Sequence, residues 1–366
     1  MPYRSRTTAV RTGTAVRTGT ARTGTAVRTG TVRTGTVRTG TAVRTGTVRT
    51  GTARTGTAVR AAAAMAAAAV VLAGAGCSVR VAANADEAAS GVIVAVGAEN
   101  TYANVIGQIG GRYVSVTAIE SNPNTDPHSF EASPGVAQAV AAARLVVQNG
   151  LGYDTYMNKI EAAAPNPARK VIDVQQLLRL PDSTPNPHLW YSPTTMPAVA
   201  KALAGDLSAI EPAHAAYFKA NERAFGHSLD SWYRAIAQFK AAFPGTRVAT
   251  TEPVGDYMLQ AAGTKNLTPF GFQADIMNGV DPAPQYVSLQ NSLLAGHKVK
   301  AFLYNQQVTD SLTQSFLAEA RKDGIPVVGV YETMPTPGYD YQSWMLAEVQ
   351  ALRRAVADKT STQKLG

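Results

Sequence analysis

Residues 211–243 read EPAHAAYFKANERAFGHSLDSWYRAIAQFKAAF. The large apolar side chains of this stretch recur at helical spacing: Tyr217, Phe218, Phe225, Leu229, Trp232, Ile236 and Phe239. About 32 helical residues at about 1.5 Å each extend for nearly 48 Å, which is longer than one small domain. We therefore predict a connecting helix over 211–243 that joins two lobes, with its aromatic stripe packed into the core.

Short β-rich runs alternate with helical stretches on both sides of this helix. The expected strands lie at 92–96, 113–117, 145–147 and 170–174, and then at 247–251, near 267, at 300–304 and at 325–330. Such alternation predicts parallel sheets with covered faces. The expected fold is α/β with two lobes, 91–210 and 244–366, each a mostly parallel sheet covered by helices and joined by the one long connecting helix.

The N-terminal 60 residues differ from the rest in composition. They repeat Arg-Thr-Gly-Thr and hold 12 Arg, no Lys and no acidic residue. We expect this segment to be disordered, or its start to be mis-assigned, because it offers little apolar surface to bury. The formal charge of the chain is +9, but without residues 1–60 it falls to −3, from 22 basic and 25 acidic residues. A mildly acidic body argues against nucleic-acid binding.

Residues 61–76 form an uncharged stretch of Ala, Val, Leu, Gly and one Met that directly follows Arg60. Sixteen residues suit a signal peptide better than a membrane-spanning helix, which needs about 20. The stretch ends at Cys77, the single cysteine of the chain. Small residues before a lone Cys resemble a lipoprotein cleavage site; the alternative is a plain secretory signal with an incidental Cys. We expect an exported protein, lipid-anchored at Cys77 on the extracytoplasmic face, with 77–90 as a tether.

Four loops at expected strand ends carry candidate metal ligands, namely His128, His188, Glu252 and Glu332. In open parallel sheets, ligands bind at the carboxyl ends of the strands. Two donors come from each half, so a bound ion would lie between the lobes. Two imidazoles and two carboxylates suit Zn, Mn or Fe(II), and do not suit Cu(I) or an all-oxygen Ca site.

Each candidate also has a simpler explanation. A histidine in a proline-bounded loop can merely form hydrogen bonds, and Glu252 before Pro253 can be a first-turn acid that the helix dipole favours. Both histidines, however, follow an Asp-Pro or Asn-Pro pair and precede a Ser-Pro pair at similar spacing, which favours a shared role. The other histidines, 214, 227 and 297, are interpreted as structural or solvated.

These motifs resemble a known family. DPHSFE at 126–131 with Ser-Pro at 133–134, and NPHLW at 186–190 with Ser-Pro at 192–193, look like the paired signatures of the metal-specific solute-binding lipoproteins of bacterial zinc/manganese ABC importers. The similarity extends over nearly all of residues 90–358.

The resemblance implies the ligands as well as the fold. Its metal histidines fall on His128 and His188, and its third ligand, which begins a His/Glu-x-x-x-x-Tyr pattern, falls on Glu252. Its fourth ligand is usually Asp, where this chain offers Glu332, with Asp340 as the substitute to test. Asn186 stands where Asp is common.

The implied function is capture without catalysis. A monomer would bind one divalent metal ion, Zn2+ or Mn2+, in an interlobe cleft and deliver it to the membrane permease of an ABC importer. Two alternatives remain at this stage: a metal-dependent hydrolase, because two histidines and one carboxylate can also hold catalytic zinc, and an adhesin or structural lipoprotein that keeps the fold without metal.

Overall fold

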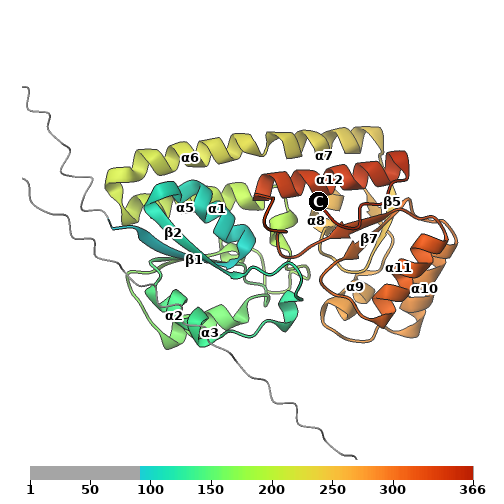
Figure 1. Ribbon diagram of the computed structural model, residues 1–366, viewed down its shortest axis with the longest axis horizontal. Helices are drawn as coiled ribbons and strands as arrows, with labels where there is room; N and C mark the ends of the chain where they lie inside the picture. The colour runs from blue at the N-terminus through green and yellow to red at the C-terminus, as the bar shows by residue number, and fades with distance from the viewer. Residues whose placement is uncertain (1–90, 366) are drawn as a thin grey trace, which may run out of the picture. The chain divides into compact units, whose positions relative to one another are not determined.

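The computed structural model describes residues 91–365, all of which belong to one compact unit, Val79–Gly366 (Figure 1). Two four-stranded sheets are present in this part of the chain, with strand orders β2-β1-β3-β4 and β6-β5-β7-β8, and their ladders are parallel. The predicted α/β fold with two lobes is confirmed. The expectations for residues 1–90, including the repeat, the signal peptide and the lipid on Cys77, lie outside the described residues.

All eight predicted strands are present within one to three residues of their expected bounds. They are β1 Ile93–Glu99, β2 Val114–Glu120, β3 Leu145–Gln148, β4 Lys170–Asp173, β5 Arg247–Thr250, β6 Lys265–Asn266, β7 Ala301–Asn305 and β8 Val327–Val330. The central strands β3 and β7 and the edge strand β8 are buried along their whole length, which explains their continuous apolar runs.

The helices cover the faces of these sheets (Figure 1). They are α1 Asn100–Gly110, α2 Pro134–Ala142, α3 Thr155–Ala163, α4 Val174–Leu177, α5 Thr195–Ile210, α6 Ala215–Ser228, α7 Asp230–Ala242, α8 Asp256–Ala261, α9 Phe270–Met277, α10 Pro284–Ala295, α11 Ser311–Lys322 and α12 Tyr341–Asp358. Among residues 91–365, none of these helices is both long and apolar enough to cross a bilayer.

The predicted connecting helix is realised as two helices. The 3-10 turn η5 Pro212–His214 precedes α6, and Leu229 alone separates α6 from α7. Leu229 keeps helical backbone angles, φ −77° and ψ −13°, so the direction of the helix is maintained. α6 packs on α5 of the first lobe, and α7 packs on α12 of the second. The pair therefore bridges the two lobes (Figure 1).

The apolar stripe of the connecting helix is core, as predicted. Phe218, Leu229 and Trp232 have no exposed surface, and Phe225 and Phe239 are 3% and 1% exposed. These side chains belong to a cluster that includes residues of both lobes, so the same apolar surface joins the two sheets.

The loop between β8 and α12 ends at a capped helix start. Asp340 is the N-cap residue: its carboxylate accepts a hydrogen bond from the Ser343 backbone N–H at 2.8 Å, and the Ser343 hydroxyl accepts from the Asp340 backbone N–H at 3.0 Å. Such a capping box stabilises the first turn of a helix. The loop between β8 and Asp340 carries Glu332.

Candidate metal centre

The two predicted histidines lie in short turns of the first lobe. His128 is the middle residue of the 3-10 turn η3 Pro127–Ser129, and Asp126 caps this turn by accepting a hydrogen bond from the His128 backbone N–H at 2.8 Å. His188 directly precedes η4 Leu189–Tyr191, and its backbone N–H donates to the Asn186 side-chain oxygen at 3.0 Å. In each motif the Asp or Asn two residues before the histidine therefore shapes the turn that holds it.

Both imidazoles converge on one carboxylate oxygen of the second lobe. The Nε2 atoms of His128 and His188 each lie 3.1 Å from Oε2 of Glu332. One ligand atom from each of these three residues lies within 4.8 Å of the other two, and no other group of at least three His, Cys, Asp or Glu residues does so among residues 91–365. We call these three residues the His-His-Glu cluster.

The loop that carries Glu332 is held from both lobes. Gln307 of the second lobe accepts hydrogen bonds from the backbone N–H groups of Glu332 and Thr333 at 2.7 and 2.8 Å. Asn100, the first residue of α1, both donates to the Met334 carbonyl, at 2.8 Å, and accepts from the Met334 N–H, at 3.0 Å. The backbone that carries Glu332 is therefore held in place from both lobes.

Glu252 lies beside the His-His-Glu cluster without joining it. Asn305, the last residue of β7, donates from Nδ2 to Oε1 of Glu252 at 2.9 Å and to Oε1 of Glu332 at 2.7 Å. The second oxygen of Glu252 is buried and has no hydrogen-bond partner among the described residues. Three of the four predicted residues, His128, His188 and Glu332, thus lie together. Glu252 is linked to Glu332 through the Asn305 amide, which donates to both.

The protonation states follow from these contacts. Burial raises the pKa of Glu332, but the hydrogen bonds and charges of the two imidazoles outweigh it and hold that pKa below its usual range. Burial lowers the pKa of His128, but Glu332 outweighs it and raises that pKa above its ordinary value. Burial dominates at His188, whose pKa is lowered. Burial and the charge of Glu332 raise the pKa of Glu252. Glu332 is the ionised group of the cluster.

Asn186 determines which nitrogen of His188 faces the cluster. The Asn186 side-chain oxygen lies 2.8 Å from Nδ1 of His188, and its Nδ2 donates to the Pro253 carbonyl at 2.8 Å. Because that oxygen can accept but not donate, Nδ1 carries a proton, and Nε2 is the nitrogen that faces Glu332 and that would bind an ion. Tyr257 of the second lobe donates to the Asn186 carbonyl at 2.8 Å, so the His188 turn also contacts the opposite lobe.

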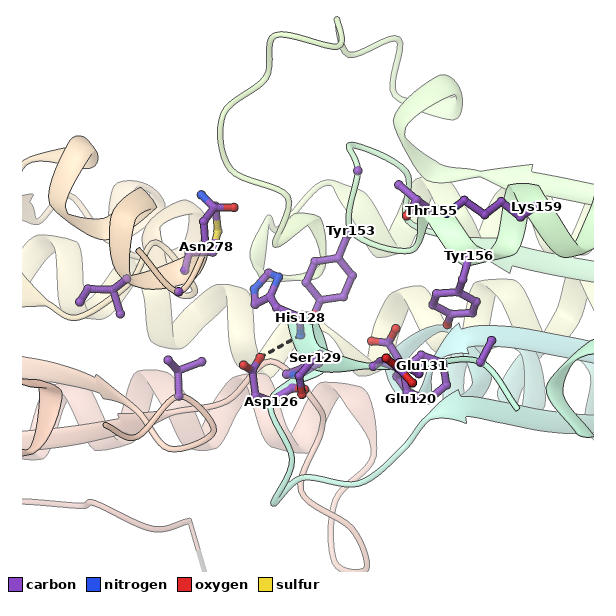
Figure 2. Close-up of a pocket in the computed structure, with 18 residues that line it drawn as sticks. Glu120, Asp126, His128, Ser129, Glu131, Tyr153, Thr155, Tyr156, Lys159 and Asn278 are labelled. Carbon is purple, nitrogen blue, oxygen red and sulfur yellow. Dashed lines mark hydrogen bonds between the residues drawn. The ribbon is translucent and has the colours of Figure 1, made fainter. Parts of the chain in front are cut away.

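A cavity of about 680 Å3 opens beside His128 and is lined by residues of both lobes. Figure 2 shows the His128 ring next to that of Tyr153, with Asn278 across from them. The His128 side chain is 22% exposed, whereas His188 has no exposed surface. His128 is therefore the member of the cluster that solvent reaches.

Sequence reasoning missed the residues that hold Glu332. Tyr153 donates to Oε2 of Glu332 at 2.9 Å, and Asn305 and Gln307 hold its carboxylate and its backbone. A signal for two of them was available, because Asn305 and Gln307 lie at the carboxyl end of a predicted strand. The substitute ligand Asp340 caps α12 and is not in the cluster. His214 stacks on Tyr113, and His227 and His297 are exposed.

Residues 95–355, more than half of the chain, match the model of the family described as the zinc-uptake complex component A, periplasmic (ZnuA). The chain belongs to the ZnuA family. The predicted resemblance is confirmed, because this family and the relatives below are metal-binding proteins of the expected kind.

Two curated relatives of this ZnuA-family chain match it over part of their length. The manganese-binding lipoprotein MntA of Bacillus subtilis (strain 168) is 27% identical over 135 residues, which are 34% of this chain and 44% of MntA. The zinc-binding protein TroA of Treponema pallidum (strain Nichols) is 23% identical over 170 residues, 44% of this chain and 53% of TroA. The chain thus matches about half the length of each relative.

Solved structures share the fold of this ZnuA-family chain over a longer stretch. The Mn-bound periplasmic metal binding protein of Candidatus Liberibacter asiaticus has a TM-score of 0.60 at 19% identity, over 72% of this chain and 99% of that one. A crystal structure titled ZnuA has a TM-score of 0.59 at 21% identity, over 73% of this chain and all of that one. At these identities the likeness concerns the fold.

Proposed function

We propose that this chain is an extracytoplasmic solute-binding protein that captures one divalent transition metal ion, Zn2+ or Mn2+, between its lobes and delivers it to the permease of an ABC importer. One observation carries the proposal: the Nε2 atoms of His128 and His188 lie 3.1 Å from the same oxygen of Glu332. Two imidazoles and a carboxylate at such distances are a typical donor set for a transition metal.

Glu252 completes the donor set in this proposal. Its unpartnered buried oxygen is available to an ion, and its carboxylate already shares the Asn305 amide with Glu332. Four protein donors fill the coordination sphere of a zinc ion, whereas a hydrolytic zinc site keeps one position open for water. The donor set therefore favours capture and release of the ion over catalysis.

The family supports the delivery step. The ZnuA family is described as a component of a zinc-uptake complex, and the relatives MntA and TroA are named for manganese and zinc binding. MntA is named a lipoprotein, which agrees with a lipid on Cys77 as the anchor of this chain. Intact mass measurement of the exported protein and of Cys77→Ser tests that anchor: the acyl mass is expected on the first and not on the second.

Metal analysis of the exported protein tests the central proposal. We expect about one equivalent of bound Zn2+ or Mn2+ per chain. His128→Ala should weaken binding at least about 100-fold, equal to about 2.7 kcal/mol, because it removes one donor of the cluster.

His227→Ala is the matched control, since His227 lies exposed on α6 and is not a member of the cluster. It should leave the dissociation constant unchanged in titration calorimetry. A wild-type protein that binds neither ion, or a His128→Ala variant that binds as tightly as the control, would overturn the proposal.

A further inference from the structure

One amide nitrogen holds both carboxylates of the candidate site. Nδ2 of Asn305 donates to Oε1 of Glu252 at 2.9 Å and to Oε1 of Glu332 at 2.7 Å. A side-chain amide has two N–H groups, so each carboxylate receives one of them. Asn305 itself has no exposed surface.

The orientation of this amide is fixed from the other side. Oδ1 of Asn305 accepts the Gln307 backbone N–H at 3.0 Å, and its backbone N–H donates to the Thr251 hydroxyl at 3.0 Å. Because the oxygen of the amide faces Gln307, the nitrogen must face the two glutamates. The Asn305 amide is therefore held in one orientation at the end of β7, so its contacts with the two glutamates do not depend on a freely rotating side chain.

The consequence concerns how many oxygens each glutamate can offer to an ion. Oε1 of each carboxylate accepts a hydrogen bond from Asn305, which holds that oxygen toward the amide. Oε2 of Glu332 faces the two imidazoles and also accepts the Tyr153 hydroxyl, and Oε2 of Glu252 has no partner among the described residues. Each glutamate is thus left with one oxygen directed away from the amide.

We infer that Asn305 makes this site selective for Zn2+ over Mn2+ by restricting Glu252 and Glu332 to coordination through a single oxygen each. The inference rests on the proposed function. Two imidazole nitrogens and two single oxygens give four donors, the number that Zn2+ takes in tetrahedral sites. Mn2+ favours octahedral, oxygen-rich coordination, which this donor set would reach only if both carboxylates bound through two oxygens.

Water can reach the site along His128, whose side chain is 22% exposed, but not along its other donors. His188 has no exposed surface, and Glu252 and Glu332 are 2% and 1% exposed. An Mn2+ ion in this site would therefore have to draw its remaining ligands from water on the His128 side as long as Asn305 holds both Oε1 atoms.

The test compares dissociation constants for Zn2+ and Mn2+ in the wild type and in Asn305→Ala. Loss of the amide frees both Oε1 atoms, so the ratio of the Mn2+ constant to the Zn2+ constant should fall at least about tenfold, equal to about 1.4 kcal/mol. Asn266→Ala is the matched control: its amide donates to Thr250 and Asp256 in the same lobe, at 3.1 and 3.0 Å, and contacts neither glutamate. The control should keep the wild-type ratio.

X-ray absorption of the wild-type protein provides a second measurement that needs no variant. We expect four nitrogen and oxygen neighbours around bound Zn2+, with each carboxylate bound through one oxygen. An unchanged ratio in Asn305→Ala, a fall of equal size in Asn266→Ala, or two-oxygen carboxylate coordination of Zn2+ in the wild type would overturn the inference. A wild type that binds no metal would instead defeat the proposed function, so the two failures are distinguishable.

Discussion

The His-His-Glu cluster and the Glu252–Asn305 pair lie side by side but are held in different ways. In the cluster, two imidazoles contact one ionised oxygen at 3.1 Å. In the pair, the carboxylate of Glu252 contacts a neutral amide, and burial together with the charge of Glu332 raises its pKa. Three candidate donors are therefore already assembled in the structure, whereas Glu252 lies outside that cluster and would have to approach a bound ion. The cluster should therefore dominate affinity.

The largest effect on metal affinity is expected when Glu332 or Glu252 is replaced by glutamine in separate variants. Glu332→Gln removes the charge that both imidazoles face, so we expect metal affinity to fall at least about 100-fold, equal to about 2.7 kcal/mol. Glu252→Gln should cost less, about tenfold, because Glu252 is not part of the assembled cluster. Calorimetry with Zn2+ measures both. Equal losses, or a larger loss for Glu252→Gln, would show that the comparison is wrong.

An effect no larger than that of Glu332→Gln is expected at Asn186, which orients His188 without belonging to the cluster. Asn186→Ala removes the acceptor of the Nδ1–H and the contact with Pro253. Partners of this kind change metal affinity by roughly 10–100-fold when they are lost. Asn186→Asp restores the acceptor and should recover much of the affinity. If Asn186→Ala binds Zn2+ like the wild type, the histidine does not need this support.

The smallest effect is expected on the pH dependence of stability, through Glu348, a buried carboxyl group outside the candidate metal site. Glu348 on α12 accepts hydrogen bonds from the Trp344 indole at 3.1 Å and from the Tyr191 hydroxyl at 3.3 Å, and burial raises its pKa to about 8 from 4.5. A raised pKa means that the neutral form is favoured in the folded protein. The contribution of the Glu348 carboxyl group to folding stability is complete below about pH 4.5 and is lost as the pH rises through about 8.

Glu348→Gln should therefore flatten the dependence of the melting temperature on pH between about 4.5 and 8. Glu319→Gln is the control, because Glu319 is paired with Lys322 at 3.0 Å near the surface of α11. Thermal unfolding of the metal-free proteins at several pH values makes the comparison. A pH dependence of Glu348→Gln that equals that of the wild type would contradict the neutral state of Glu348.

The fold was predictable because its signals are local. Apolar runs with turn residues between them defined all eight strands, and the stripe from Tyr217 to Phe239 defined the bridge between the lobes. The separation of this bridge into α6 and α7 at Leu229 was not predicted, since Leu229 carries no glycine or proline signal and keeps helical angles.

The residues of the candidate site could be proposed from the sequence, but their supports could not. Repeated Asp/Asn-Pro-His motifs indicated the two histidines, and the rule for strand ends indicated the two glutamates; their role as metal ligands stays a prediction. The unequal roles of Glu252 and Glu332 depend on Asn305, Gln307 and Asn100, which approach them from distant parts of the chain. Such long-range hydrogen bonds leave no periodic pattern in a sequence, so their partners could be recognised only in three dimensions.

The unequal exposure of the two imidazoles implies an order for ligand exchange. His128 borders the cavity, while His188 lies behind it without exposed surface. A hydrated ion approaching from the cavity would exchange its first water for Nε2 of His128 and reach His188 afterwards, and release would run in the reverse sequence. His128 would then be the last protein ligand that a departing ion contacts.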